Sequence, residues 1–193
     1  MRRQLLTGLL MVLSMTVLCG LAYPLLVLGA SQVAFKDKAN GSLVTVDGVE
    51  VGSSLIGQNF TKPEYFQPRP SAAGKTGYDP LASSASNLGP TNDTLITEVN
   101  ERTIAYRQRN GLAADAAVPV DAVTSSGSGL DPHISVANAR LQADRVAEAR
   151  GVSVERVNQA IDAATVGRAL GFLGEPGVNV VELNLALDAA TAR

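Results

Sequence analysis

The 193-residue sequence contains one cysteine, one histidine and few aromatic residues, which make up 4% of the chain. Because Cys19 has no second cysteine to pair with, the core must hold together without disulfides. One histidine without clustered cysteines leaves only carboxylates such as Asp79, Asp121 and Asp131 as metal ligands, so we expect no metal site. The net charge of −2 provides no basic excess for phosphates, so we expect no nucleic-acid partner.

Charged residues are absent from residues 4–35. As a helix, Leu5–Ala30 would measure about 39 Å, at about 1.5 Å per residue, which exceeds the ~30 Å hydrocarbon core of a bilayer. The sequence therefore predicts one transmembrane helix in contact with the lipid bilayer. Arg2 and Arg3 precede this helix, whereas residues 36–38 carry two lysines and one aspartate. The positive-inside rule then predicts a cytoplasmic N-terminus.

A cleaved signal peptide is the alternative for this segment, because Leu28-Gly29-Ala30 loosely suits a signal peptidase. Signal peptides have apolar regions of about 7–15 residues, however, and this one is much longer. We therefore expect a retained anchor. The predicted division is residues 1–36, a cytoplasmic stub and transmembrane helix, and residues 37–193, a soluble periplasmic domain.

Strand and helix patterns in the second part lack a regular βαβ alternation, which predicts an α+β soluble domain tethered by the single N-terminal transmembrane helix. The expected strands are Leu43–Val46 and Val49–Val51, joined by an Asp-Gly turn and extended by Ser54–Ile56, and Pro119–Val123. The expected helices run from Thr91 or Asn92 to about Gly111, from Ser135 to about Arg150, and onwards from Ser153. Residues 61–90 should form a long irregular segment packed through its aromatic residues.

The C-terminal pattern is ambiguous, because Val181, Leu183, Leu185 and Leu187 alternate with other residues as in a strand. A capping-box-like pair three residues apart, Asn and Glu at 179 and 182, favours a helix. We expect the helix.

Ser126, Ser128, Asp131 and His133 bring hydrolase residue types into one short segment. Triad members normally converge from separate parts of a fold, and a Gly-x-Ser-x-Gly motif would need glycine at position 126. The alternative is a glycine-rich turn that leads into a helix, with exposed amides that suit an anion. No lysine follows as in a P-loop. We expect no catalytic residue here.

Small polar and glycine-rich stretches recur in the predicted loops, where they either form tight turns or dock on another molecule. The candidate interface residues are Arg69, Pro70, Ser71, Asn87, Gly89, Pro90, Asn92, Ser126, Gly127, Ser128, Gly129, Asp131, Pro132 and His133.

A resemblance to a known family rests on these stretches. Tyr65-Phe66 with residues 69–74, residues 86–92, residues 125–135, and residues 174–176 with 178–188 together resemble the KdpC family, the C subunit of the bacterial high-affinity potassium-transporting ATPase. One departure is Ser83-Ser84-Ala85-Ser86, where the family more often has Ser-Gly-Gly-Ser. This departure leaves the local backbone shape open, because alanine resists the positive φ that glycine accepts.

The resemblance implies an inner-membrane complex of a channel-like potassium-translocating subunit, a P-type ATPase subunit and a small membrane subunit. This chain would be a non-catalytic accessory subunit with no tightly bound cofactor, which stabilises the assembly and assists K⁺ entry or ATP use. The family is also described as a catalytic chaperone that raises the ATP affinity of the pump subunit. That alternative implies nucleotide contact through Gln142, and it conflicts with a periplasmic domain because ATP is cytoplasmic.

Overall fold

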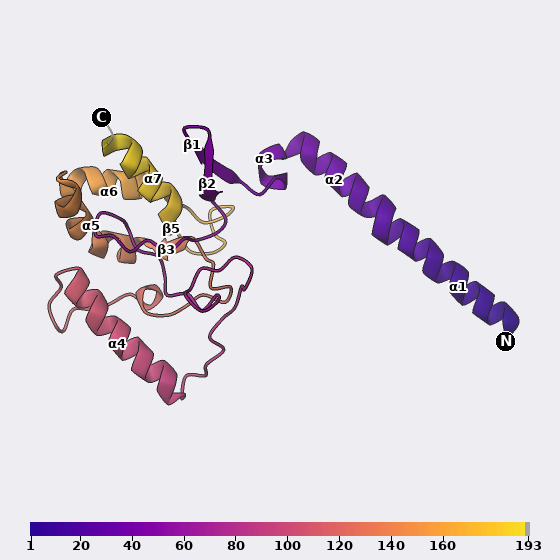
Figure 1. Ribbon diagram of the computed structural model, residues 1–193, viewed down its shortest axis with the longest axis horizontal. Helices are drawn as coiled ribbons and strands as arrows, with labels where there is room; N and C mark the ends of the chain where they lie inside the picture. The colour runs from indigo at the N-terminus through magenta and orange to yellow at the C-terminus, as the bar shows by residue number, and fades with distance from the viewer. Residues whose placement is uncertain (192–193) are drawn as a thin grey trace. The chain divides into compact units, whose positions relative to one another are not determined.

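The computed structural model describes residues 1–191, and for Thr191 it describes the backbone alone (Figure 1). Its internal contacts divide the chain into two compact units, Met1–Ser53 and Ser54–Arg193. The predicted assignment of residues 37–193 to one periplasmic domain stays a prediction.

The first unit begins with a continuous helix over Arg2–Ala34, which is apolar and long enough to cross a membrane, as predicted. It consists of α1 (Arg2–Val17), a π-helical turn η1 (Leu18–Ala22) and α2 (Tyr23–Ala34). Pro24 lies just after the π-helical turn, and because proline has no N–H to donate it disturbs the regular hydrogen-bond ladder. A short helix α3 (Lys36–Ala39) follows.

The predicted hairpin completes this unit. Strands β1 (Leu43–Val46) and β2 (Val49–Ser53) pair antiparallel, and their two-residue turn has positive φ at Asp47 and Gly48, 51° and 79°. This is the backbone geometry that a type I′ turn requires. The predicted extension of the strand over residues 54–56 is wrong: β1 begins at Leu43, which pairs with Ser53, so later residues have no partner strand.

The second unit contains a three-stranded antiparallel sheet that the sequence did not predict. Its strands are β3 (His133–Ser135), β5 (Gly177–Asn179) and β4 (Thr165–Val166), with β5 in the centre. Each strand has two or three residues, too few for an alternating pattern to be recognised.

Helices α5 (Val136–Arg150) and α7 (Val180–Thr191) contact this sheet, and α6 (Val154–Ala163) packs against both of these helices. Ser135 and Ser153 cap α5 and α6 through their hydroxyl oxygens, as predicted. The side-chain oxygen of Asn179 accepts from the backbone N–H groups of Val181 and Glu182, at 3.1 and 3.2 Å. The C-terminal segment is therefore the expected helix.

The core of this unit consists mainly of small aliphatic side chains. It comprises Phe66, Ile134, Ala139, Ala143, Val146, Ala147, Val157, Ile161, Val178, Val180, Leu183 and Leu187. Four of these residues, Ala139, Ala143, Val146 and Ala147, form the buried face of α5. Phe66 comes from the irregular segment and is fully buried, so that segment is packed, as predicted.

Helix α4 (Asp93–Arg109) matches the predicted helix and is capped by Asn92. Figure 1 shows α4 on the opposite side of β3 and β5 from α6 and α7. The predicted strand at residues 119–123 is wrong, because Val120–Ala122 form a 3₁₀ turn, η2. The N–H groups of Ala122 and Thr124 donate to carbonyls three and four residues earlier, so they satisfy their hydrogen bonds locally.

Candidate functional site

Ser71 ties together two loops that are far apart in the sequence. Its hydroxyl donates to the carbonyl of Gly129, 2.6 Å away, and accepts from the backbone N–H groups of Ala73 and Tyr78, at 3.1 and 2.8 Å. One side chain thereby satisfies backbone groups of residues 71–78 and holds them against the Ser-Gly loop, residues 125–133.

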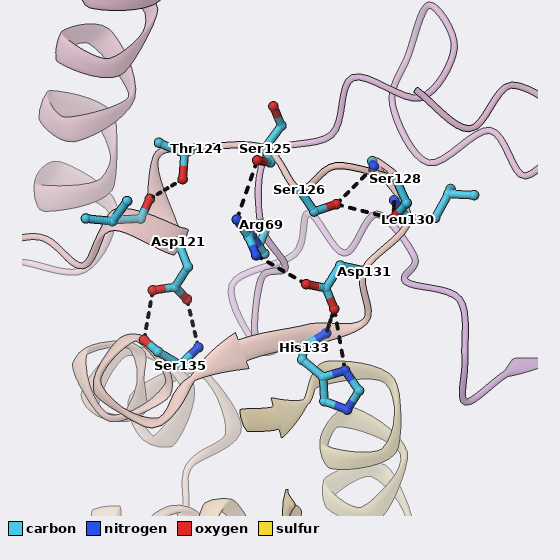
Figure 2. Close-up of polar contacts among 12 residues, drawn as sticks. Arg69, Asp121, Thr124, Ser125, Ser126, Ser128, Leu130, Asp131, His133 and Ser135 are labelled. Atoms are coloured by element: carbon cyan, nitrogen blue, oxygen red, sulfur yellow. Dashed lines mark hydrogen bonds and ion pairs between the residues drawn. The ribbon is translucent and has the colours of Figure 1, made fainter. Parts of the chain in front are cut away.

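Arg69 makes the second link between these loops (Figure 2). Its guanidinium lies 3.2 Å from the Asp131 carboxylate and donates to the Ser125 carbonyl at 3.4 Å. Tyr78 donates its hydroxyl to the Arg69 carbonyl at 2.7 Å. Burial, with the negative charge of Asp131, raises the pKa of Tyr78 above its ordinary value, so the phenol stays protonated and can donate. Asp131 also accepts from the backbone N–H of His133 at 2.9 Å.

Gly129 lies at the closest approach of the two loops. Its φ is +67°, and a Cβ there would lie 2.6 Å from the Ser84 carbonyl oxygen and 2.8 Å from the Ala73 nitrogen. Ser84 donates its backbone N–H to the Ser128 carbonyl, and Ser83 donates its hydroxyl to the same oxygen, each at 2.9 Å. None of residues 83–86 has a positive φ, so alanine at position 85 fits this backbone.

These loops line an open groove of about 620 Å³. The lining residues are Leu55, Ile56, Arg69, Ser125, Ser126, Gly127, Ser128, Leu130, Asp131 and Pro132. Six of the fourteen candidate interface residues therefore share one surface. Leu55 and Ile56 are 61% and 37% exposed, which gives the groove an apolar side that the sequence prediction missed. Nothing in the sequence indicates that Leu55 and Ile56 are exposed together, because polar residues flank them and they lie in a turn without periodicity.

Comparison with known proteins identifies the chain. A family model described as "K+-transporting ATPase, c chain", KdpC, matches residues 5–189. The chain belongs to the KdpC family. A relative named "Potassium-transporting ATPase KdpC subunit" from Mycobacterium tuberculosis (strain H37Rv) is 60% identical over 188 residues, which cover 97% of this chain and 99% of the relative.

Relatives with the same name occur in other bacteria. The Caulobacter vibrioides (strain NA1000) protein is 59% identical over 175 residues, covering 90% of this chain and 87% of its own length. The Koribacter versatilis protein is 51% identical over 189 residues, covering 97% and 95%. The family resemblance predicted from the loop motifs is confirmed.

The Ser-Gly loop of this KdpC-family chain is organised as a turn. Ser126 accepts from the Gly129 N–H at 2.9 Å, and Ser128 accepts from the Leu130 N–H at 3.1 Å. The His133 ring lies 3.4 Å from Asp131, and within residues 1–191 no hydrogen bond joins that ring to either serine (Figure 2). His133 itself lies on β3, whereas a glycine-rich turn that leads directly into the helix was expected.

Four other candidate interface residues belong to a separate exposed turn before α4. Asn87 has a φ of +54°, the Gly89 carbonyl accepts from the Asn92 N–H at 3.0 Å, and Asn92 caps the helix. Pro90 lies between them. Ser71, Gly129 and His133 support the groove loops, and Pro70 lies beside them in the chain. All of these interface assignments stay predictions.

Gln142, on α5, is buried to 1% exposure, and both ends of its amide are occupied. Its oxygen accepts from the Gln67 backbone N–H and from Arg145, each at 2.8 Å. Its nitrogen donates to the Gln67 carbonyl at 3.1 Å and to Asn138 at 2.9 Å. The Gln142 amide therefore bonds to both backbone groups of Gln67 in the irregular segment, much as a neighbouring strand would.

Asn184, on α7, does the same for the neighbouring residue of that segment. It accepts from the Phe66 N–H at 2.8 Å and donates to the Phe66 carbonyl at 2.9 Å. The sequence analysis missed this residue. Its signal is a polar side chain on the apolar face of a helix, next to Leu183 and Leu187.

The carboxylates considered as metal ligands have other, separate partners. Asp121 accepts from both the N–H and the hydroxyl of Ser135 at 2.8 Å, and from Asn138 at 2.9 Å, so it supports the start of α5. Asp131 pairs with Arg69, and Asp79 accepts from the Leu81 N–H. Over the described part of the chain, no group of three or more His, Cys, Asp or Glu side chains is placed to hold a metal ion.

A second cavity, of about 240 Å³, lies between α4 and the irregular segment. Arg69, Arg102, Arg109, Tyr106 and Gln142 are among its lining residues, and the described lining contains no acidic side chain. Arg102 is paired with Glu98 at 2.9 Å, outside that lining. Burial, with the nearby charge of Arg109, lowers the pKa of Arg145, which donates to Gln142, to about 10. Arg145 therefore stays charged at neutral pH.

Proposed function

We propose that this chain is a non-catalytic accessory subunit of a potassium-transporting ATPase complex, in which it stabilises the assembly and assists K⁺ entry. The names of its relatives support membership of such a complex. The apolar helix Arg2–Ala34 supports a single-pass position in the bacterial inner membrane. The two arginines at its N-terminal end support a cytoplasmic N-terminus, which leaves residues 37–193 on the periplasmic side.

The observation that carries this proposal is the groove lined by Leu55, Ile56, Arg69 and the Ser-Gly loop. Its backbone is already ordered by the Arg69–Asp131 pair and by the Ser71–Gly129 hydrogen bond. A surface ordered before binding loses little conformational entropy when a partner docks, which favours a stable assembly. Leu55 and Ile56 supply exposed apolar contact area beside it.

The groove suits a covering or clamping role better than coordination of potassium. The carbonyls of Ser125, Ser128 and Gly129 already accept hydrogen bonds from other parts of the same unit. Those of Leu130 and Pro132 accept from the N–H groups of Gly57 and Val180. K⁺ sites are built from carbonyl oxygens that replace the hydration shell of the ion. We infer that this loop assists K⁺ entry through its partner subunit and binds no K⁺ itself.

The alternative is a catalytic chaperone that binds ATP with the pump subunit and raises its ATP affinity. The arginine-lined cavity next to Gln142 is the observation that favours it. However, this cavity of about 240 Å³ is smaller than the ~300–1,000 Å³ of typical small-molecule sites. A nucleotide contact through Gln142 would also replace hydrogen bonds to Gln67 and Asn138. We therefore place this alternative second.

Topology separates the two proposals. In a chain carrying Cys19→Ala and Ser128→Cys, a membrane-impermeant maleimide should label intact spheroplasts, because Ser128 is exposed. Gln4→Cys in the same background is the cytoplasmic control and should be labelled only after permeabilisation. If Ser128→Cys instead needs permeabilisation, the orientation is reversed and the ATP-dependent alternative is restored.

Assembly tests the docking surface. Deletion of residues 37–193 should leave an inserted anchor but abolish purification of an intact complex. Leu55→Ser with Ile56→Ser should weaken the complex, whereas Leu81→Ser, at a 96% exposed position outside the groove, should not. A fully active, intact complex from the deletion chain would refute the stabilising role.

A further inference from the structure

The connection between β4 and β5, residues 167–176, forms a small hairpin whose backbone is largely satisfied from within. Ala169 and Leu173 exchange two N–H···O hydrogen bonds, each 2.9 Å long. The N–H groups of Gly171 and Phe172 donate to the carbonyls of Arg168 and Ala169, at 3.1 and 3.3 Å. Leu170 and Gly171 turn the chain with positive φ, 54° and 83°.

The end of this hairpin is apolar and exposed. Leu170 is 83% exposed, Phe172 69% and Leu173 50%. No charged side chain lies between Arg168 and Glu175 in the sequence, and these two form an ion pair of 2.7 Å at the base. Large apolar side chains grouped in this way mark an interaction site.

We propose that the hairpin tip, residues 169–173, inserts into the interfacial region of the bilayer that the N-terminal helix spans. The bilayer is the apolar phase to which this chain is tethered. The apolar helix ends at Ala34, and only residues 35–53 separate it from the second unit. At ~3.3–3.6 Å per extended residue, that connection reaches roughly 65 Å at most, so the second unit remains tethered within reach of the membrane surface.

The chemistry of the tip matches shallow insertion. Backbone N–H groups that lack a partner are costly in lipid, and those of residues 169, 171, 172 and 173 already have one. Phenylalanine and leucine are typical of surfaces that insert about 5–10 Å into the headgroup and acyl boundary. A stable protein interface buries about 800 Å² per partner, so three side chains alone favour lipid over protein as the occupant. The inference does not depend on the proposed orientation, because both sides of the anchor face a bilayer surface.

Fluorescence tests this directly, because the natural sequence contains no tryptophan. The full-length chain with Phe172→Trp would be reconstituted into vesicles of phosphatidylethanolamine and phosphatidylglycerol, with and without brominated acyl chains. Emission should shift to shorter wavelength and be quenched by the brominated lipid. Because the tip has no net charge, both effects should persist at high salt.

Val120→Trp is the matched control, since Val120 is 73% exposed on a different loop and should stay unquenched. Leu170→Trp should reproduce the result at a second tip position if the first substitution disturbs the hairpin. Water-exposed emission from both tip positions, equal to that of Val120→Trp, would overturn the proposal. Burial of the tip only in the assembled complex would overturn it too, and would assign the tip to a partner subunit. Neither result would affect the test of topology at Ser128.

Discussion

The hydroxyl of Tyr106 on α4 donates to the side-chain oxygen of Asn138 on α5, 2.8 Å away, although 32 residues separate them in the sequence. Asn138 in turn donates to Asp121 at 2.9 Å. The side chains of Tyr106 and Asn138 are both buried. This chain of hydrogen bonds connects α4, the turn at η2 and the start of α5, so it positions one wall of the arginine-lined cavity.

Tyr106→Phe should reduce the free energy of unfolding by about 1 kcal/mol, the net worth of one buried hydrogen bond. The loss should stay this small because Asn138 still accepts from Gln142. Urea unfolding of the full-length chain in detergent, followed by tyrosine circular dichroism, measures it. Tyr65→Phe is the comparison: its bond to Asp188 is 3.3 Å long and partly exposed, so its loss should be smaller.

Alkaline pH should destabilise the second unit. Burial, with smaller contributions from Asp121 and Asp131 respectively, raises the pKa of Tyr106 and Tyr78 above the ordinary value of 10. Below pH 10 both tyrosines are protonated in the folded and unfolded chains. Above it the unfolded chain releases these protons and the folded chain retains them, so stability falls as pH rises.

Arg145 acts in the opposite direction over the same range, because burial lowers its pKa from 12.5 to about 10. There the unfolded chain retains a proton that the folded chain has released. The two tyrosines outweigh this single arginine, so a net loss of stability should remain as pH rises above 10. Stability that is independent of pH in this range would contradict the assignment, and Tyr106→Phe should reduce the slope.

Gly129→Ala should be strongly destabilising, by about 1–3 kcal/mol for the backbone conformation alone. The close approach of Ser84 and Ala73 to the added Cβ should increase this cost. Gly127→Ala is the control, because it has no positive φ and no neighbouring atom within 4 Å. Thermal unfolding should separate these variants, and equal melting temperatures would show that the two loops do not need this close contact.

Gln142→Ala should lower the free energy of unfolding by about 3 kcal/mol, since it leaves the Gln67 N–H and the Arg145 guanidinium without this acceptor. Gln159→Ala, at an exposed position on α6, should have little effect. If Gln142 is structural, surviving complex should keep its KM for ATP. A raised KM with unchanged stability would support the nucleotide-binding alternative instead.

Much of the fold follows from local signals in the sequence. The long apolar helix follows from the absence of charge over residues 4–35, and the first hairpin from the Asp-Gly turn. Helix starts at residues 93, 136, 154 and 180 follow from the capping side chains one residue before each. These features depend on neighbours in the chain, so the residues that carry them also reveal them.

The tertiary structure alone decided the pairings between residues that are distant in the sequence. The partner of Gln142 lies 75 residues away, that of Asn184 lies 118 away, and Ser71 meets Gly129 across 58. Strands β3, β4 and β5 are too short to show a pattern, because each exists through its neighbours in the sheet. The sequence by itself determined the long apolar helix, the other helices and the family. The sequence did not show which polar side chains are buried against the irregular segment and which line the groove. Both depend on contacts that the chain makes by closing long loops, and no local pattern indicates those contacts.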